Sequence, residues 1–224
     1  MKELQPRRVI VLSLLIGLAV SAALAWSMAR QDHQADDHLE LERRAAYRFE
    51  HYRGLTPCDP ETLDITSAAR AALRREGVTD SGMVAIVAPT FHGAKVAGFG
   101  TSAIDVLHFK GDTGYTRPEA WFQVVNGKPV SIPLSPRDHF AIVTPLSRHI
   151  RFADTRSRSG LDGVTYFLEL GGHCGYSWSP RREDGPSGLI AELLKELAQP
   201  QPSLEALLIL AAEIDQQDRS FGGG

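Results

Sequence analysis

Residues 164–170, VTYFLEL, determine the fold class that this sequence predicts. Apolar side chains stand at every second position of this run, and successive side chains of a β-strand point to opposite faces of a sheet. We expect a strand with one face, formed by residues 164, 166, 168 and 170, against the core.

Seven further short runs have β character, and turns separate them closely. Close spacing of this kind favours antiparallel pairing, because a parallel pair needs a long crossover connection. The runs are residues 83–88, 95–99, 104–109, 120–125, 128–134, 140–144 and 149–153.

Asn126-Gly127 marks the clearest turn between two of these runs. A type I′ turn requires positive φ at both central residues, which Asn and Gly tolerate best. The sequence therefore predicts a hairpin of residues 120–125 with residues 128–134. Pro129 and Pro133 place the second arm at an edge of the sheet.

Helical patterns precede and follow these runs in the sequence. Asp59-Pro60-Glu61 has the composition of a helix start, with an N-cap, a proline at the first helical position and an acid in the first turn. This helix should end near Glu76, with Gly77 in a left-handed conformation. Residues 189–197 have an amphipathic pattern, and Ser203 can cap a last helix.

The predicted fold is therefore α+β: an N-terminal transmembrane helix, then helices packed on a mostly antiparallel sheet, with two C-terminal helices covering the same face. The glycine-rich residues 171–188 are expected to form a loop.

Residues 9–28 are uncharged and flanked by arginines, and they determine where the remainder of the chain should lie. A helix of this length reaches about 30 Å, the thickness of the hydrocarbon core. Positive charge precedes the segment and acidic residues soon follow it, so the N-terminus should stay in the cytoplasm. We expect a single-pass signal-anchor in a bacterial inner membrane, with the domain in the periplasm.

Cleavage of this segment is the open alternative. Ala23-Leu24-Ala25 has the small-x-small form that signal peptidase accepts, and cleavage there would give a secreted domain. The apolar run is longer than the usual h-region of a signal peptide, and Trp26 suits an interfacial anchor, which favours retention.

The predicted organisation has five parts. These are a cytoplasmic N-terminus at 1–8, the transmembrane segment at 9–29, a stalk helix at 30–56, an α+β domain at 57–220 and a flexible tail at 221–224.

The chain has two cysteines, Cys58 and Cys174. In an oxidising compartment we expect them to form one disulfide, with two buried free thiols as the alternative. Closing so long a loop should stabilise the fold by roughly 4–5 kcal/mol on the chain-entropy model.

Two groups of residues are candidates for binding a ligand or partner. Arginines gather around residues 148–158 and again at 181–182, where they could engage an anion, a lipid head group or an acidic partner. Aromatic residues near the second cysteine could line a pocket. The candidates are Arg156, Arg158, Arg181, Arg182, Tyr176 and Trp178.

The sequence lacks the motifs that several kinds of functional site would require. The histidines and acids do not have the ligand spacing of HExxH or CxxC, so we predict no metal site. Residues 98–103 match GxGxxA, but a strand rather than a helix should follow them, so we predict no dinucleotide cofactor. The net charge of −3 and the expected location argue against nucleic acid as a partner.

The functional prediction is a membrane-tethered, non-catalytic interaction or assembly subunit, whose partners are the bilayer through residues 9–29 and a membrane protein. The alternative is an extracytoplasmic, sensor-like domain that binds a small ligand. A thiol-dependent hydrolase is the third possibility, and it would need one of the cysteines as a thiolate beside a histidine.

Overall fold

The computed structural model describes residues 54–111, 113, 118–151, 153 and 163–222. They belong to a compact unit that covers residues 50–224. The predicted transmembrane segment 9–29, and the stalk up to residue 53, lie outside the described residues. Within the described ranges no helix has the length and apolar character needed to cross a bilayer.

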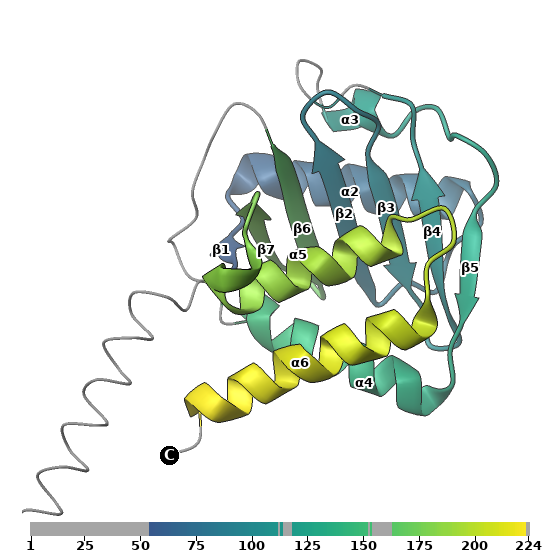
Figure 1. Ribbon diagram of the computed structural model, residues 1–224. Helices are drawn as coiled ribbons and strands as arrows, with labels where there is room; N and C mark the ends of the chain where they lie inside the picture. The colour runs from purple at the N-terminus through teal and green to yellow at the C-terminus, as the bar shows by residue number, and fades with distance from the viewer. Residues whose placement is uncertain (1–53, 112, 114–117, 152, 154–162, 223–224) are drawn as a thin grey trace, which may run out of the picture. The chain divides into compact units, whose positions relative to one another are not determined.

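One antiparallel sheet forms the centre of the domain (Figure 1), and every strand pair in it is antiparallel, as predicted. Its strand order is β1-β7-β6-β2-β3-β4-β5. In chain order the strands are β1 (Thr56–Pro57), β2 (Met83–Pro89), β3 (Lys95–Phe99), β4 (Ala103–His108), β5 (Val130–Pro133), β6 (Val164–Leu170) and β7 (His173–Trp178).

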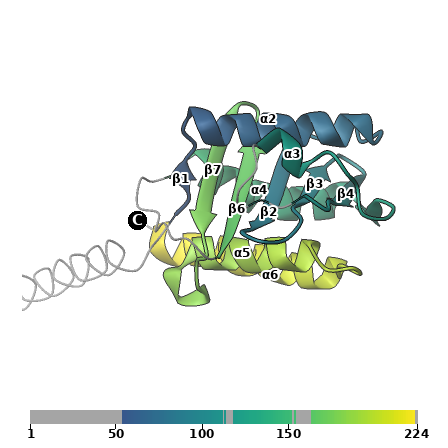
Figure 2. The ribbon, with the colours of Figure 1, turned by 90° about the horizontal axis from the view of Figure 1, so that it is seen from above.

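Helices cover both faces of this sheet (Figure 2). One face packs against α2 (Pro60–Arg75) and the short α3 (Pro118–Trp121). The other face packs against α4 (Pro136–Arg151), α5 (Pro186–Leu197) and α6 (Leu204–Gly222), with the 3₁₀ turn η1 (Arg182–Asp184) before α5. The α+β class is confirmed, whereas the expectation that all helices cover one face is wrong.

The prediction that β6 has a single core face is also wrong. Tyr166 and Leu168 pack on the α5 side, while Phe167 packs on the α2 side. Because both faces are covered, consecutive residues of the strand are buried.

Helix α2 begins and ends as the sequence predicts. The Asp59 side chain accepts a hydrogen bond from the Thr62 backbone N–H at 2.8 Å, and Pro60 is the first helical residue. The same hydrogen bond lowers the pKa of the Asp59 carboxyl, because it stabilises the ionised form. Gly77 follows the C-cap with φ of +86°.

The predicted strands at 140–144 and 149–153 are wrong, because residues 140–144 and 149–151 lie in the single helix α4. The Ser135 hydroxyl and the Asp138 carboxylate cap its start, and Pro136 is its first residue. The interior proline, Pro145, and the β-branched residues at 142–144 conceal the helix in the sequence.

The predicted hairpin at Asn126-Gly127 is wrong as well. Gly127 has φ of +90°, as a turn requires, but the two arms do not pair with each other. Strand β5 pairs with β4, while Val125 bridges to Phe109 beyond the end of β4. Residues 120–125 are not a strand, because Phe122 turns into the core below α2, where the Arg75 guanidinium donates to its carbonyl oxygen.

Strand β7 replaces the first part of the predicted glycine-rich loop. Gly171 and Gly172, with φ of +58° and +85°, form a tight turn that pairs β6 with β7. Gly175 leaves room for Leu55, since a Cβ there would lie 2.9 Å from the Leu55 Cβ. Leu55 and Thr56, which the sequence assigns to the stalk, are part of the domain.

Candidate functional site

The predicted disulfide is present and joins Cys58 to Cys174, with 5.3 Å between the Cα atoms. It connects the end of β1 to β7, and the Cys58 backbone N–H donates to the Cys174 carbonyl oxygen at 3.1 Å. Because both sulfurs are bonded, neither cysteine is a thiolate in this state, and the structure does not favour the thiol hydrolase.

Arg182 is an internal tether rather than a free cation. Its guanidinium forms ion pairs with Glu192 of α5 and Glu213 of α6. It thereby holds η1 against the two C-terminal helices.

Arg181 is exposed. Its guanidinium lies 3.8 Å from the Glu183 carboxylate, and its backbone N–H donates to the Asp184 carboxylate at 2.8 Å. Arg156 and Arg158 lie outside the described residues. The structure therefore does not gather the predicted arginines into one described site.

Tyr176 and Trp178 face the other side of the sheet. Tyr176 packs on Phe167, with 6.0 Å between the ring centroids, beside the cluster below α2. Trp178 covers Gly163, where a Cβ would lie 2.8 Å from the indole Cε2. These two rings fill the α2 side of the sheet, whereas Arg182 binds helices of the opposite layer.

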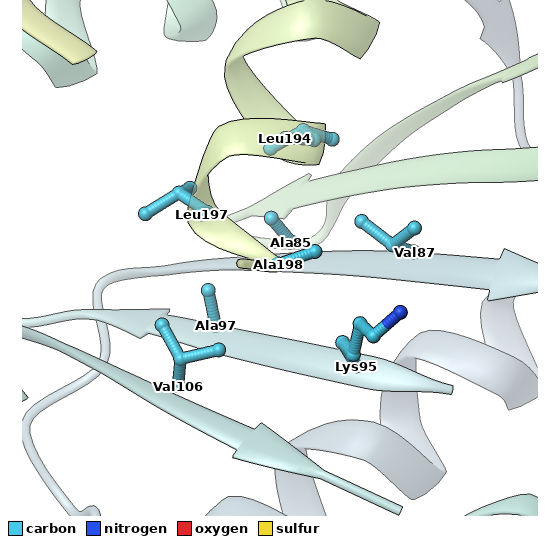
Figure 3. A pocket seen from close by; sticks show the side chains of 8 residues that line it. All are labelled: Ala85, Val87, Lys95, Ala97, Val106, Leu194, Leu197 and Ala198. Carbon is cyan, nitrogen blue, oxygen red and sulfur yellow. The ribbon is translucent and has the colours of Figure 1, made fainter. Parts of the chain in front are cut away.

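A small cavity that the sequence does not predict lies between the end of α5 and the sheet (Figure 3). The space measures about 190 Å³ when the part open to solvent is counted, and its enclosed part has room for about one water molecule. Three of the lining residues are alanines, so the strands and the end of α5 pack closely without filling the space. Its lining residues are Ala85, Val87, Lys95, Ala97, Val106, Leu194, Leu197 and Ala198.

Lys95 is the one charged residue among the lining residues. Its side chain rises from the first residue of β3 beside Val87 (Figure 3). It is half-buried, and in the described part of the chain it has no carboxylate partner.

A row of residues continues from Lys95 across the sheet. Val87 pairs with Tyr166 on one side and with Lys95 on the other, and Lys95 pairs with His108. Directly paired residues point to the same face, so all four face the layer of α5. Lys195 of α5 completes the group, because its Nζ lies 5.9 Å from the centre of the Tyr166 ring.

His108 is half-buried at the end of this row. Its Nε2 is shielded from solvent and has no hydrogen-bond partner within the described residues. Burial lowers the pKa of its imidazole, and the positive charge of Lys95 lowers it further. At neutral pH the ring is therefore neutral and can donate or accept a hydrogen bond.

Burial also raises the pKa of the Tyr166 phenol to about 12. The phenol is therefore neutral at physiological pH. With His108 also neutral, the charge beside the cavity comes from Lys95 and Lys195.

Acidification should weaken the fold through His108. The folded state holds the imidazole pKa below its ordinary value, so below about pH 6.5 the unfolded chain binds a proton that the folded chain does not. Stability should therefore fall as the pH drops from 7.5 to 5.5, and His108→Asn should reduce that slope. Urea unfolding at both pH values measures the effect. The exposed His173→Asn is the control, and an unchanged slope in His108→Asn would contradict the expectation.

The group combines an apolar cavity, whose lining includes Lys95, with Lys195 and the neutral imidazole of His108 on the same face of the sheet. In the described ranges of the chain no three His, Cys, Asp or Glu side chains come close enough to hold a metal ion. Asp105 and His108, two potential metal ligands, face opposite sides of the sheet, because Asp105 pairs with Gly98 and not with Lys95.

A signal for this site does exist in the sequence. Lysine is rare in this chain, and Lys95 stands at the start of an otherwise apolar strand, KVAGF, while Lys195 stands within the apolar pattern of α5. Only the strand register, with α5 packed across the sheet, brings them to the same face. No protein-family model matches this chain, and neither a curated protein nor a solved structure matches it in the comparisons made.

Proposed function

We propose that this protein is an extracytoplasmic, non-catalytic domain that binds a small ligand and is tethered to the membrane by residues 9–29. The cavity below the end of α5, with the half-buried and unpaired Lys95 in its wall, is the observation that carries the proposal. A rigid sheet supplies most of the lining, which favours a preformed site.

The disulfide supports an extracytoplasmic location, because such bonds persist in oxidising compartments. The uncharged run at 9–28 supports the tether, with a single-pass, N-in topology in a bacterial inner membrane and the domain in the periplasm. Release after cleavage at Ala25 would leave the binding function intact.

The volume of the cavity limits what can bind. Pockets for drug-sized molecules enclose roughly 300–1,000 Å³. The space below α5 is far smaller once the part open to solvent is left out, so we expect a ligand that places a small apolar group at its mouth. For so few atoms a dissociation constant on the order of 0.1–1 mM is reasonable.

Filling the cavity should abolish binding without weakening the fold. In Ala198→Leu the larger side chain would occupy the space between Leu194, Leu197 and the sheet. We expect an unchanged or slightly higher melting temperature, since cavity filling is commonly neutral or stabilising. Ala212→Leu, at an exposed position of α6, is the matched control.

The measurement is NMR of alanine methyl groups in the full chain, held in lipid nanodiscs and titrated with six-carbon probes: hexanoate, 1-hexanol and hexylamine. The proposal requires that at least one probe shifts the methyl signals of Ala85 and Ala97 saturably, and that Ala198→Leu removes the response. If no probe shifts them, the proposed function is wrong.

An interaction or assembly subunit is the second candidate function. Two large apolar side chains, Phe140 on α4 and Ile209 on α6, are 69% and 54% exposed on the helical layer. A membrane protein that co-purifies in fixed ratio with the wild type, and is lost from Phe140→Ser/Ile209→Ser but kept by Ala198→Leu, would favour this function.

A further inference from the structure

We infer that the outer face of α6 is an interface with a second copy of this chain, and that the two α6 helices pack antiparallel about a two-fold axis at Ala212. This inference does not depend on ligand binding at the cavity. It names the partner of a surface, around Ile209, for which the second candidate function gives only a class of protein.

The exposed residues of α6 form a stripe with the spacing of a helix–helix contact. Helix α6 packs mainly on α4 and α5, so its opposite side faces solvent. The exposed side chains in the described part of this helix follow one another at intervals of four, three, four and three residues. An average of about 3.5 residues is the repeat that keeps one seam of two helices in contact. The residues are Glu205, Ile209, Ala212, Gln216 and Arg219.

The charges of this stripe are self-complementary. Glu205 and Arg219 each stand seven residues from Ala212, one before it and one after it, which is about 10.5 Å along the helix. A two-fold axis through Ala212 exchanges the two ends, so it brings Glu205 of each copy level with Arg219 of the other. The antiparallel dimer therefore forms two contacts between opposite charges. A parallel pair would place glutamate beside glutamate and arginine beside arginine.

Both charged side chains can make these contacts. Within the part of the chain that the structure describes, Glu205 forms no ion pair. The Arg219 Nη2 lies 3.1 Å from the Asp215 carboxylate, but the Arg219 side chain remains 73% exposed. Because a guanidinium has five N–H donors, Arg219 can bind a second carboxylate while it keeps the first.

The centre of the stripe has the shape that a close pair of helices requires. Ala212 is small, so the two backbones can approach each other at the axis. Ile209 is 54% exposed, although isoleucine is usually buried. In the antiparallel seam its side chain enters the space between Ala212 and Gln216 of the other copy, as a knob enters a hole. The dimer therefore removes this apolar surface from water.

The length of the contact indicates a dimer that membrane tethering would favour. Residues 205–219 extend over about 21 Å, so the buried area is at the low end for a protein interface. Such a contact is weak between free molecules. Two chains anchored by residues 9–28 in the same membrane would meet at a higher effective concentration, which raises the fraction of dimer.

Ala212→Cys tests the two-fold axis. Cys58 and Cys174 are bonded to each other, so the introduced cysteine supplies the one free thiol. At the axis the two copies of this residue lie within the range of a disulfide, whose Cα atoms are about 4.4–6.8 Å apart. Mild oxidation of the full chain in lipid vesicles should give a crosslinked dimer on non-reducing electrophoresis. Ala71→Cys, at an exposed alanine of α2 on the opposite face of the sheet, is the matched control and should crosslink several-fold less.

Exchange of the two charges tests the antiparallel arrangement. Glu205→Arg or Arg219→Glu, each combined with Ala212→Cys, places like charges at both contacts and should reduce the crosslinked fraction about fivefold. The exchanged pair Glu205→Arg/Arg219→Glu restores opposite charges and should recover most of the crosslinking. Recovery would show that the loss in the single variants does not come from unfolding.

Each of three outcomes would overturn the inference. The first is an Ala212→Cys protein that crosslinks no more than Ala71→Cys. The second is an exchanged pair that crosslinks no better than the single charge variants. The third is a crosslink from Ala212→Cys to a protein of another mass in place of the dimer, which would favour the second candidate function. The cavity is tested by a different readout, the alanine methyl signals, so failure of the dimer leaves the proposed function standing.

Discussion

The double variant Cys58→Ser/Cys174→Ser should unfold with a free energy about 4–5 kcal/mol lower than that of the oxidised wild type. The disulfide spans 116 residues, and a crosslink over so long a loop strongly restricts the unfolded chain. Because domains of this size are stable by only about 5–15 kcal/mol, this loss removes a large share of the total.

Loss of the disulfide should also have a local effect on the sheet. Strand β1 consists of two residues, and the disulfide follows it directly. Without the bond, the pairing of Thr56 and Pro57 with Tyr176 and Gly175 has little else to hold it. Amide exchange at Cys58, whose N–H donates to the Cys174 carbonyl oxygen, should therefore accelerate in the reduced protein.

Urea unfolding with and without a reducing agent measures the larger effect. The reduced wild type should match the double variant, which serves as its control. An unfolding midpoint for the double variant equal to that of the oxidised wild type would contradict the prediction.

The second large effect is expected at the ion pair between Arg70 of α2 and Glu169 of β6. Glu169→Gln should lower the free energy of unfolding by about 3 kcal/mol, because it leaves a largely buried guanidinium without its counter-charge. The side chains of Arg70 and Glu169 are 23% and 10% exposed. The Arg70 Nε donates to the Glu169 carboxylate at 3.0 Å.

Further hydrogen bonds fix this pair in place. The Arg70 Nη1 donates to the Ser81 carbonyl oxygen at 2.6 Å, and the Gly172 N–H donates to the second Glu169 oxygen at 3.0 Å. The pair thus connects α2, the turn before β2 and the turn between β6 and β7. Its loss should weaken the packing of α2 on the sheet.

The control for this prediction is Glu183→Gln. Glu183 also pairs with an arginine, Arg181, but both side chains are about 70% exposed, so we expect a change below about 0.5 kcal/mol. Replacing both partners, as Arg70→Met/Glu169→Leu, should recover much of the loss, because apolar replacement of a buried pair is often neutral. Equal unfolding energies for Glu169→Gln and Glu183→Gln would refute the prediction.

Local signals in the sequence were sufficient for much of this fold. The cap formed by Asp59 and Pro60, the apolar stripe at 189–197 and the β-rich runs at 83–109 and 164–170 all lie in elements of the expected type. In these segments short-range preference and burial favour the same structure. The two cysteines were sufficient for the disulfide, since a chain with a single pair leaves only one intramolecular bond to form.

Tertiary contacts decided the remainder. Helix α4 forms despite Pro145 because its apolar residues, Ile142, Leu146 and Ile150, are buried against the sheet. Phe122 leaves the predicted strand because the core below α2 accepts its ring. Burial of these side chains outweighs the local preference of the backbone.

The sequence alone could not predict the candidate site for the same reason. Lys95, Tyr166 and Lys195 are 29 to 100 residues apart in the chain, and only the pairing of β6, β2 and β3, with α5 laid across them, gathers them on one face of the sheet. The sequence by itself determined helices α2, α5 and α6, most of the strands and the disulfide, and it carries the expectation of a membrane tether. Strand register decides which side chains share a face of the sheet. Because register depends on pairing between distant segments, only the tertiary structure determined it.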